Sequence, residues 1–242
     1  MTCAVGQDYW DTAYEDLPLA YSPGVVQFKE LFDRYLTPGG TCFEVGCYPG
    51  SYLIYLGKRF DYTVSGIDAT PFILSRLPKH LAQHRVRVGR LYHGDFLAFE
   101  ARRTYDLVCS FGFIEHFADF QEVIVRHIRL VKRPGTLVLA CPNLRGIQYM
   151  LHRLLDPVNL QRHVLAAMDF ARWEETLEAS GMTVLYQGYY RTADFWVDTP
   201  RQGFLAKVAI NSVRKIAQEV DSRTNWPNPL LSPYMISFSR KV

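Results

Sequence analysis

Apolar runs of strand length alternate with stretches of helical spacing through the middle of the chain, from about Thr41 to Ala140. The runs of strand length lie at residues 41–46, 62–68, 86–92, 105–109 and 136–140. The intervening helical patterns lie at residues 51–60, 70–77 and 120–131. Such alternation is typical of a parallel sheet with helices on both faces. The pattern therefore predicts an α/β fold.

Two details refine this prediction. Thr70 suits a helix N-cap and Pro71 the first helical position, and Pro78 should end or kink that short helix. Pro134 and Gly135 predict a turn immediately before the last strand of the series.

The pattern continues beyond residue 140 with two further helices, two late strands and an insertion. The helices are expected at 144–155 and 168–180, the second ending at Gly181, and the strands at 182–189 and 234–238. Between the strands, residues 204–220 place their apolar positions on one side of a helix, which predicts a cover over the core. A helix that binds a partner or a membrane surface is the alternative. We therefore expect one domain over 1–242, made of an N-terminal extension (1–40), a core (41–190), a late insertion (191–233) and a last strand (234–242).

Composition and charge narrow the class of protein. The chain is 48% hydrophobic and 21% charged, with a net charge of +3 spread along its length, which argues against a nucleic-acid surface. The N-terminus lacks the basic and apolar regions of a secretory signal, and no apolar run has the length of a membrane span. The five cysteines form no metal-binding spacing, so we expect no metal site and a reducing, cytoplasmic location.

The junction of the first strand and its helix carries the sequence Phe-Glu-Val-Gly-Cys-Tyr-Pro-Gly, residues 43–50. Glycine at such a junction lets the backbone approach a ligand and turn into the helix. A dinucleotide site would have a glycine at position 48, where this chain has Tyr48, and no Walker lysine follows. Glu44 would repel phosphates, but it suits a ligand with cationic groups, such as an ammonium and a sulfonium.

Two acidic residues follow the next two strands. Asp68 lies 18 residues after Gly50 at the end of the second strand, where a carboxylate can accept hydrogen bonds from the two hydroxyls of a ribose. Asp95 and Phe96 follow the third strand, where a carboxylate can accept an adenine amine beside an aromatic ring. Each of these acids equally fits a turn or a helix cap when considered alone.

In order and spacing, these elements resemble the class I S-adenosylmethionine-dependent methyltransferases, especially the small-molecule enzymes related to ubiquinone biosynthesis. The resemblance extends from about Cys42 to Gly188. It rests on five motifs, which are Glu44 with Gly46 and Gly50, Asp68, Asp95 with Phe96, the segment Ser110–Phe117, and Pro134-Gly135. One departure is Tyr48-Pro49, which replaces a glycine-rich centre.

The resemblance implies a Rossmann-like, doubly wound sheet of seven strands, with the last strand antiparallel and supplied by residues 234–238. It also implies S-adenosylmethionine as cofactor and S-adenosylhomocysteine as product. The residues it assigns to the cofactor are Glu44, Gly46, Cys47, Gly50, Asp68, Ala69, Asp95, Phe96 and Phe111.

The chemistry of methyl transfer requires a nucleophile aligned with the sulfur–methyl bond, and a hydroxyl acceptor also benefits from a general base. His116 follows the fourth strand, where the resemblance places the reactive end of the cofactor, and His163 is the second candidate base. A hydrogen bond that fixes the start of a helix is the structural alternative for His116.

Several polar residues are candidates for binding the acceptor. Glu115 adjoins His116, whereas Asn143, Arg145 and Asn159 follow the fifth strand and equally fit surface helix caps. Tyr14 belongs to an aromatic segment, residues 9–14, that resembles the lids of related methyltransferases. Packing against the edge of the sheet is the alternative for that segment.

Other functions remain open at this stage. A nicotinamide-dependent oxidoreductase is opposed by Tyr48 and Glu44, and a non-catalytic protein that binds S-adenosylmethionine would keep the same motifs. A metal-dependent catechol-type enzyme would need an acidic cluster near the fourth strand, for which the sequence offers only Glu115 and Asp119. We expect a small-molecule acceptor, most simply a hydroxyl of a sugar, phenol or other metabolite, and the oligomeric state is open, with a homodimer among the alternatives.

Overall fold

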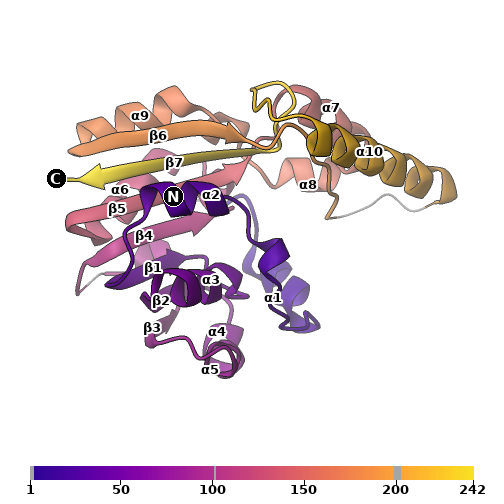
Figure 1. Ribbon diagram of the computed structural model, residues 1–242. Coiled ribbons are helices and arrows are strands. Elements are labelled where there is room, and N and C mark those ends of the chain that lie inside the picture. The colour runs from indigo at the N-terminus through magenta and orange to yellow at the C-terminus, as the bar shows by residue number, and fades with distance from the viewer. Residues whose placement is uncertain (1–2, 101, 199–202) are drawn as a thin grey trace.

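The computed structural model describes residues 3–100, 102–198 and 203–242, and within them a seven-stranded sheet forms the centre of the fold (Figure 1). The strands are β1 (Thr41–Val45), β2 (Thr63–Asp68), β3 (Val88–His93), β4 (Tyr105–Phe111), β5 (Val131–Pro142), β6 (Met182–Tyr190) and β7 (Tyr234–Lys241). Their order is β3-β2-β1-β4-β5-β7-β6, and β7 runs antiparallel to both of its neighbours. The α/β class and the antiparallel last strand are therefore confirmed.

Helices cover both faces of this sheet, because side chains of a strand point to opposite faces in turn. On one face, Cys42 packs in a cluster with residues of α2 (Lys29–Tyr35), α3 (Ser51–Phe60), α4 (Phe72–Ser75) and α5 (Leu77–Gln83). On the other face, Phe43 and Val45 pack in a cluster with residues of α6 (Phe120–Leu130) and α9 (Phe170–Ala179). The remaining helices are α1 (Gln7–Glu15), α7 (Gly146–Leu155), α8 (Pro157–Gln161) and α10 (Phe204–Arg223), with short 3-10 helices at Pro23–Val25, Phe96–Ala98, Ile114–His116 and Leu165–Ala167.

The strand order fixes the position of a crevice. The chain runs from β1 outward to β2 and β3, and then crosses back to β4 on the other side of β1. Open parallel sheets bind ligands outside the carboxyl ends of their strands at such a reversal. Figure 1 shows α1 and α8 beyond this edge of the sheet, so the extension and the segment after β5 flank the crevice.

Two local predictions were wrong. The helix expected at 70–77 is shorter: α4 begins after Pro71 and ends at Ser75. Pro78 lies in the first turn of the next helix, α5, where a backbone N–H would have no partner within the helix, so proline is tolerated. Thr70 makes no side-chain cap, since the N-cap of α4 is Pro71; the backbone N–H of Thr70 donates to Oδ1 of Asp68. Pro134 and Gly135 lie inside β5, in an irregular stretch where the register against β4 shifts.

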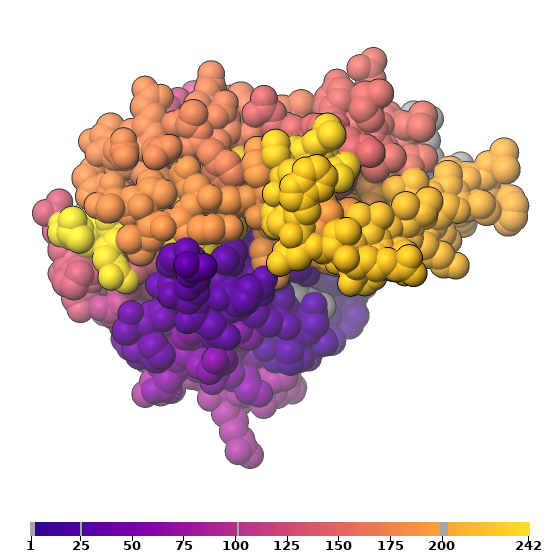
Figure 2. All heavy atoms as spheres, turned by 45° about the horizontal axis from the view of Figure 1, so that its top comes forward, coloured from indigo at the N-terminus to yellow at the C-terminus, as the bar shows by residue number. Residues whose placement is uncertain are grey.

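The helix of the late insertion does not cover the sheet. In α10 only Ile210 is buried, and it packs in a separate small cluster with Leu155 of α7 and Phe195. Leu205 and Ile216 of the predicted apolar face are 81% and 64% exposed. Figure 2 shows α10, in gold, standing out from the body of the protein. Residues 199–202 of the predicted insertion lie outside the described residues.

Among the described helices, none combines the length and the apolar character needed to cross a bilayer.

Candidate active site

Two adjoining cavities open at the carboxyl edge of the parallel strands. The larger, which we call the first cavity, has a volume of about 700 Å³ and lies over β1 and β2. The smaller, which we call the second cavity, has a volume of about 350 Å³ and lies over β4 and β5. Both are lined by Trp10, Phe111, Gly112 and His116. A group that passes from one cavity to the other must therefore pass these four residues.

The glycine loop forms one wall of the first cavity. Gly46 has a φ of +70°, and its N–H donates to the carbonyl of Ile67 at 2.9 Å. A Cβ at this position would lie 2.8 Å from Cδ2 of Phe113, which is closer than van der Waals contact allows. Glycine is thus required here both by the backbone conformation and by the approach of Phe113.

Asp68 stands at the end of β2 with its carboxylate held by the backbone. Oδ2 accepts a hydrogen bond from the N–H of Tyr48 at 2.9 Å, and Oδ1 accepts one from the N–H of Thr70 at 3.0 Å. Burial raises the pKa of Asp68, and these backbone hydrogen bonds oppose the rise. A carboxylate offers about four acceptor sites, and the backbone N–H groups of Tyr48, Thr70 and Ala69 leave at least one of them open. Because Asp68 lines the first cavity, it can accept a hydrogen bond from a ribose hydroxyl there.

Asp95 and Phe96 also line the first cavity. Oδ1 of Asp95 accepts a hydrogen bond from the N–H of Leu97 at 2.8 Å, so this acid caps a short 3-10 helix and also faces the cavity. Phe96 is 5% exposed and its ring packs 4.7 Å from that of His127. Ala69 also lines the cavity. The structure therefore brings together Gly46, Asp68, Ala69, Asp95, Phe96 and Phe111 of the residues assigned to the cofactor.

Three residues assigned to the cofactor do not line the cavity. Glu44 and Cys47 are buried, and Gly50 is the N-cap of α3, with a φ of +94°. Burial raises the pKa of Glu44 well above its usual value, and the carboxyl group receives a backbone hydrogen bond from Leu53 of α3. The alternation along β1 explains this placement, because it directs Glu44 to the face that α3 covers.

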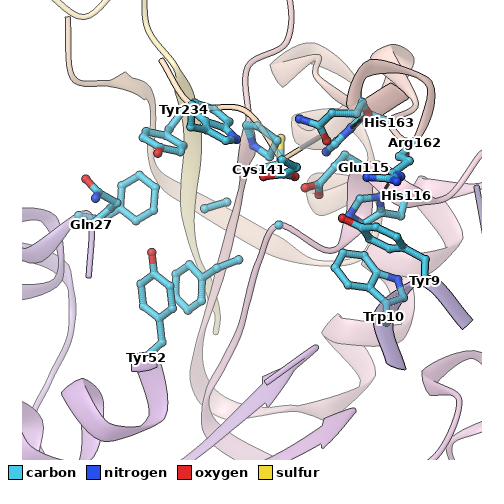
Figure 3. Close-up of a pocket in the computed structure, with 18 residues that line it drawn as sticks. Tyr9, Trp10, Gln27, Tyr52, Glu115, His116, Cys141, Arg162, His163 and Tyr234 are labelled. Carbon is cyan, nitrogen blue, oxygen red and sulfur yellow. Dashed lines mark hydrogen bonds between the residues drawn. The ribbon is translucent and has the colours of Figure 1, made fainter. Parts of the chain in front are cut away.

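The second cavity has a polar end and an aromatic end. Figure 3 shows Glu115, His116, Arg162 and His163 gathered on one side, with Tyr52 and Tyr234 on the other. The aromatic end holds two stacked pairs, Tyr52 on Phe111 at 3.7 Å between ring centroids and Tyr234 on Trp196 at 5.2 Å. Phe28 connects the pairs, since its ring lies 6.4 Å from that of Phe111 and 5.9 Å from that of Tyr234. A ligand with a flat apolar body and one polar group matches these two ends.

His116 and His163 lie side by side, with ring centroids 4.9 Å apart. Nδ1 of His116 donates to the carbonyl of Arg162 at 2.9 Å, and Nδ1 of His163 donates to the carbonyl of Asn159 at 2.7 Å. Burial, reinforced by the neighbouring His163, lowers the pKa of His116 to about 4. Burial also lowers the pKa of His163. Both rings are therefore neutral near pH 7, with a lone pair on Nε2.

Glu115 and Asn159 complete the polar end. Each is 1% exposed, and burial raises the pKa of Glu115 to about 8. Oε2 of Glu115 and both polar side-chain atoms of Asn159 have no hydrogen-bond partner in the described protein. Buried polar atoms without partners are uncommon, and here they lie at a cavity that a ligand can fill.

The other residues proposed to bind the acceptor lie outside the second cavity. The amide nitrogen of Asn143 donates to the carbonyls of Pro229 and Ser232, so this residue ties the loop before β7 to the end of β5. Arg145 is exposed and donates to the carbonyl of Met168. Neither lines a described cavity. Tyr14 lines the first cavity beside Asp68 rather than the second. Asp119, the other acid near β4, is an exposed residue at the start of α6.

Sequence reasoning missed much of the second cavity. The lining residues it did not single out include Gln27, Phe28, Tyr52, Arg162, Trp196 and Tyr234. Tyr234 had a usable signal: it begins the strand predicted to be antiparallel, so it lies at the carboxyl edge of the parallel strands. Tyr52 also had a signal, because it lies in the first turn of α3, directly after the glycine loop. The other residues come from segments whose pattern specifies no position over the sheet.

Comparison with known proteins finds relatives for the central segment of the chain. Residues 43–135 match a family described as "Methyltransferase domain". A curated relative, the methyltransferase nsrG of Aspergillus novofumigatus (strain IBT 16806), is 30% identical over 143 residues, which cover 57% of this chain and 51% of the relative. The chain therefore spans about half the length of this relative.

Solved structures share the fold at low sequence identity. A putative sarcosine dimethylglycine methyltransferase from Galdieria sulphuraria aligns with a TM-score of 0.60 and 13% identity, over 97% of each chain. The magnesium protoporphyrin IX methyltransferase of Synechocystis PCC 6803, solved with bound SAH, aligns with a TM-score of 0.55 and 12% identity, over 97% of this chain and 93% of that one. The matched segment contains the glycine loop, Asp68, Asp95 and His116. Residues 43–135 therefore match a methyltransferase domain, and the chain shares the fold of these solved methyltransferases.

Proposed function

We propose that this protein transfers a methyl group from S-adenosylmethionine to a hydroxyl of a small-molecule acceptor. The observation that carries the proposal is the pair of adjoining cavities. The first contains the two acids suited to an adenosine, and the second contains two neutral imidazoles. Their common wall, formed by Trp10, Phe111, Gly112 and His116, is where a transferred group would cross.

The first cavity fits an adenosyl ligand better than a dinucleotide. Among the described residues that line it are Asp68 and Asp95, and neither Lys nor Arg is present there. A pyrophosphate would meet carboxylates without a compensating cation, whereas a ribose diol and an adenine amine would each donate a hydrogen bond to an acid. This supports S-adenosylmethionine over a nicotinamide cofactor, which is the alternative ligand for such a sheet.

Bound in this cavity, the sulfonium of S-adenosylmethionine supplies an electrophilic methyl group. The protein's part is to hold the two reactants in line and to accept a proton. A new bond forms between the acceptor oxygen and the methyl carbon while the sulfur–carbon bond breaks, and its electron pair returns to sulfur. The hydroxyl proton moves to Nε2 of His116 or His163, the atoms left open by the hydrogen bonds at Nδ1.

The shape of the second cavity supports an acceptor with an aromatic or other flat apolar body. Its hydroxyl would face the two histidines, Glu115 and Asn159, and its body would lie against Tyr52 and Tyr234. A phenol satisfies both ends, and a sugar would use the polar end alone. Phenolic acceptors are therefore the first class to screen.

The experiment is a product assay with methyl-labelled S-adenosylmethionine and a panel of phenols, sugars and amines, using the wild-type chain and two variants, His116→Ala and His163→Ala. A single essential base contributes roughly 10²-fold or more to turnover. We expect one of the two variants to lose at least tenfold in kcat on the best acceptor. If both variants keep wild-type turnover, the histidine-base mechanism is wrong. If a protein that binds the cofactor transfers no methyl group to any acceptor of the panel, the non-catalytic binding function gains support.

A further inference from the structure

A Glu–His–His cluster lies at the polar end of the second cavity. Glu115, His116 and His163 each present one potential ligand atom, and these three atoms lie within 4.8 Å of one another. Figure 3 shows the three side chains converging from two separate segments. The segments are held together because the N–H of Val164 donates to the carbonyl of Glu115 at 2.7 Å.

The hydrogen bonds of both imidazoles leave the same atom available. A backbone carbonyl only accepts, so the Nδ1 atom of each ring must carry the hydrogen that reaches Arg162 or Asn159. The lone pair of a neutral ring is then on Nε2. Histidines that bind metals almost always donate the other ring N–H to a carbonyl or carboxylate, which fixes the tautomer and the orientation of the ring. Both rings of this cluster already have that arrangement.

Unpartnered buried atoms provide a second, independent observation. Oε2 of Glu115 and both polar side-chain atoms of Asn159 lack a hydrogen-bond partner in the described protein, although each residue is 1% exposed. Unsatisfied buried oxygens are costly, and a bound cation that contacts Oε2 of Glu115 or Oδ1 of Asn159 would offset that cost. His127 offers a contrast, because its Nδ1 also donates to a carbonyl but its ring packs against Phe96 in the core.

We propose that Glu115, His116 and His163 bind one divalent transition-metal ion, of the class of Zn²⁺, Fe²⁺ or Co²⁺. Two imidazoles and one carboxylate suit these ions, whereas Mg²⁺ prefers oxygen ligands and retains its waters. Ligands around a tetrahedral ion with bonds of about 2.0–2.1 Å lie about 3.3 Å apart, so the side chains must move inward by roughly 1 Å. Asn159 lies at the same end of the cavity as a further oxygen ligand or a partner of the bound acceptor.

Three protein ligands leave a coordination position for an outside group, as catalytic zinc sites do. The residues belong to the second cavity, so that position is available to the acceptor oxygen, a consequence that rests on the proposed function. In the metal-free protein the open Nε2 atoms serve as the base proposed above. With a metal ion bound to them, the ion would instead activate a bound hydroxyl by lowering its pKa, and the proton would pass to solvent. Metal binding itself does not depend on methyl transfer, and it is measured without cofactor or acceptor.

The test uses the full chain, stripped with a chelator and then titrated with Co²⁺, followed by visible absorption and calorimetry, with Zn²⁺ competition and Mg²⁺ as the oxygen-preferring comparison. We expect one Co²⁺ per chain, displaced by Zn²⁺ and not by Mg²⁺. Glu115→Gln and His163→Ala should each weaken Co²⁺ binding at least tenfold, whereas the control His127→Gln should leave it unchanged. Circular dichroism confirms that each variant is folded.

Three results would overturn the proposal: folded wild-type protein that binds neither Co²⁺ nor Zn²⁺, binding that survives Glu115→Gln, or an equal loss in His127→Gln. Titration of the metal-free protein with S-adenosylhomocysteine separates this proposal from the proposed function. If the protein binds the cofactor but no metal ion, the metal-site proposal is wrong and the proposed methyltransferase function stands. If it binds the metal ion but not the cofactor, the proposed function is wrong and the metal site stands.

Discussion

Replacing Asp68 with Ala tests how the first cavity would hold a ribose. Backbone N–H groups leave at least one acceptor site of this carboxylate open at the cavity. A hydrogen bond to a charged group contributes about 1.5–3 kcal/mol, so losing one ribose contact costs about that much. Because about 1.4 kcal/mol corresponds to a tenfold change, we expect S-adenosylhomocysteine to bind roughly tenfold more weakly or worse.

The same variant also removes the acceptor of the backbone N–H groups of Tyr48 and Thr70, so its stability must be measured in parallel. Asp106→Ala is a matched control. Asp106 likewise accepts a backbone N–H, from Thr41 at 2.9 Å, but it lies at the opposite end of the sheet and lines neither cavity. Calorimetric titration of both variants at a temperature where both are folded is the assay. An affinity of Asp68→Ala within threefold of wild type, or an equal loss in Asp106→Ala, would refute the reasoning.

Three further predictions follow from the described contacts. Gly46→Ala should lower the free energy of unfolding by about 1–3 kcal/mol, because alanine disfavours the positive φ and its Cβ would clash with Phe113. The melting temperature should fall and cofactor binding should weaken, and an unchanged melting curve would contradict this. Deleting residues 1–20 removes Trp10 and Tyr14 from the first cavity, so S-adenosylhomocysteine affinity should fall at least tenfold, whereas unchanged affinity and turnover would remove the lid hypothesis. The third prediction concerns Asp106. Partial burial raises the pKa of its carboxyl group, but hydrogen bonds from Lys132 and Thr41 outweigh burial and lower this pKa below its usual 3.8. Its contribution is therefore present above about pH 4 and lost as pH falls through the lower folded-state pKa, so the stability deficit of Asp106→Ala, about 1 kcal/mol at pH 7, should shrink towards pH 3 in denaturant titrations.

The pattern of the sequence was sufficient to predict the sheet. Short runs of mostly apolar residues located all seven strands. β1, β2 and β4 are buried along most of their length, although Glu44 interrupts the apolar residues of β1 and Ser65 those of β2. The pattern failed at α10, where one apolar side of a helix was interpreted as a core contact although only Ile210 is buried. Periodicity reports that a helix has an apolar face, and it does not report what covers that face.

The candidate site was predictable where residues follow a strand directly. Asp68, Asp95 and His116 follow β2, β3 and β4, and strand order alone brings such residues to one edge. Asn143 also follows a strand, but its amide binds the carbonyls of a loop 86 to 89 residues away, which no local pattern reveals. The Glu–His–His cluster escaped prediction for the same reason, because His163 reaches Glu115 only through the packing of the segment after α8.

The central claim is that the first cavity binds S-adenosylmethionine. The most direct test is calorimetric titration of the purified, ligand-free protein with S-adenosylmethionine and with S-adenosylhomocysteine, with NAD as the control ligand. We expect binding of both adenosyl ligands in the micromolar range and no heat with NAD. Folded protein that binds neither adenosyl ligand would contradict the account, and binding of NAD instead would favour an oxidoreductase.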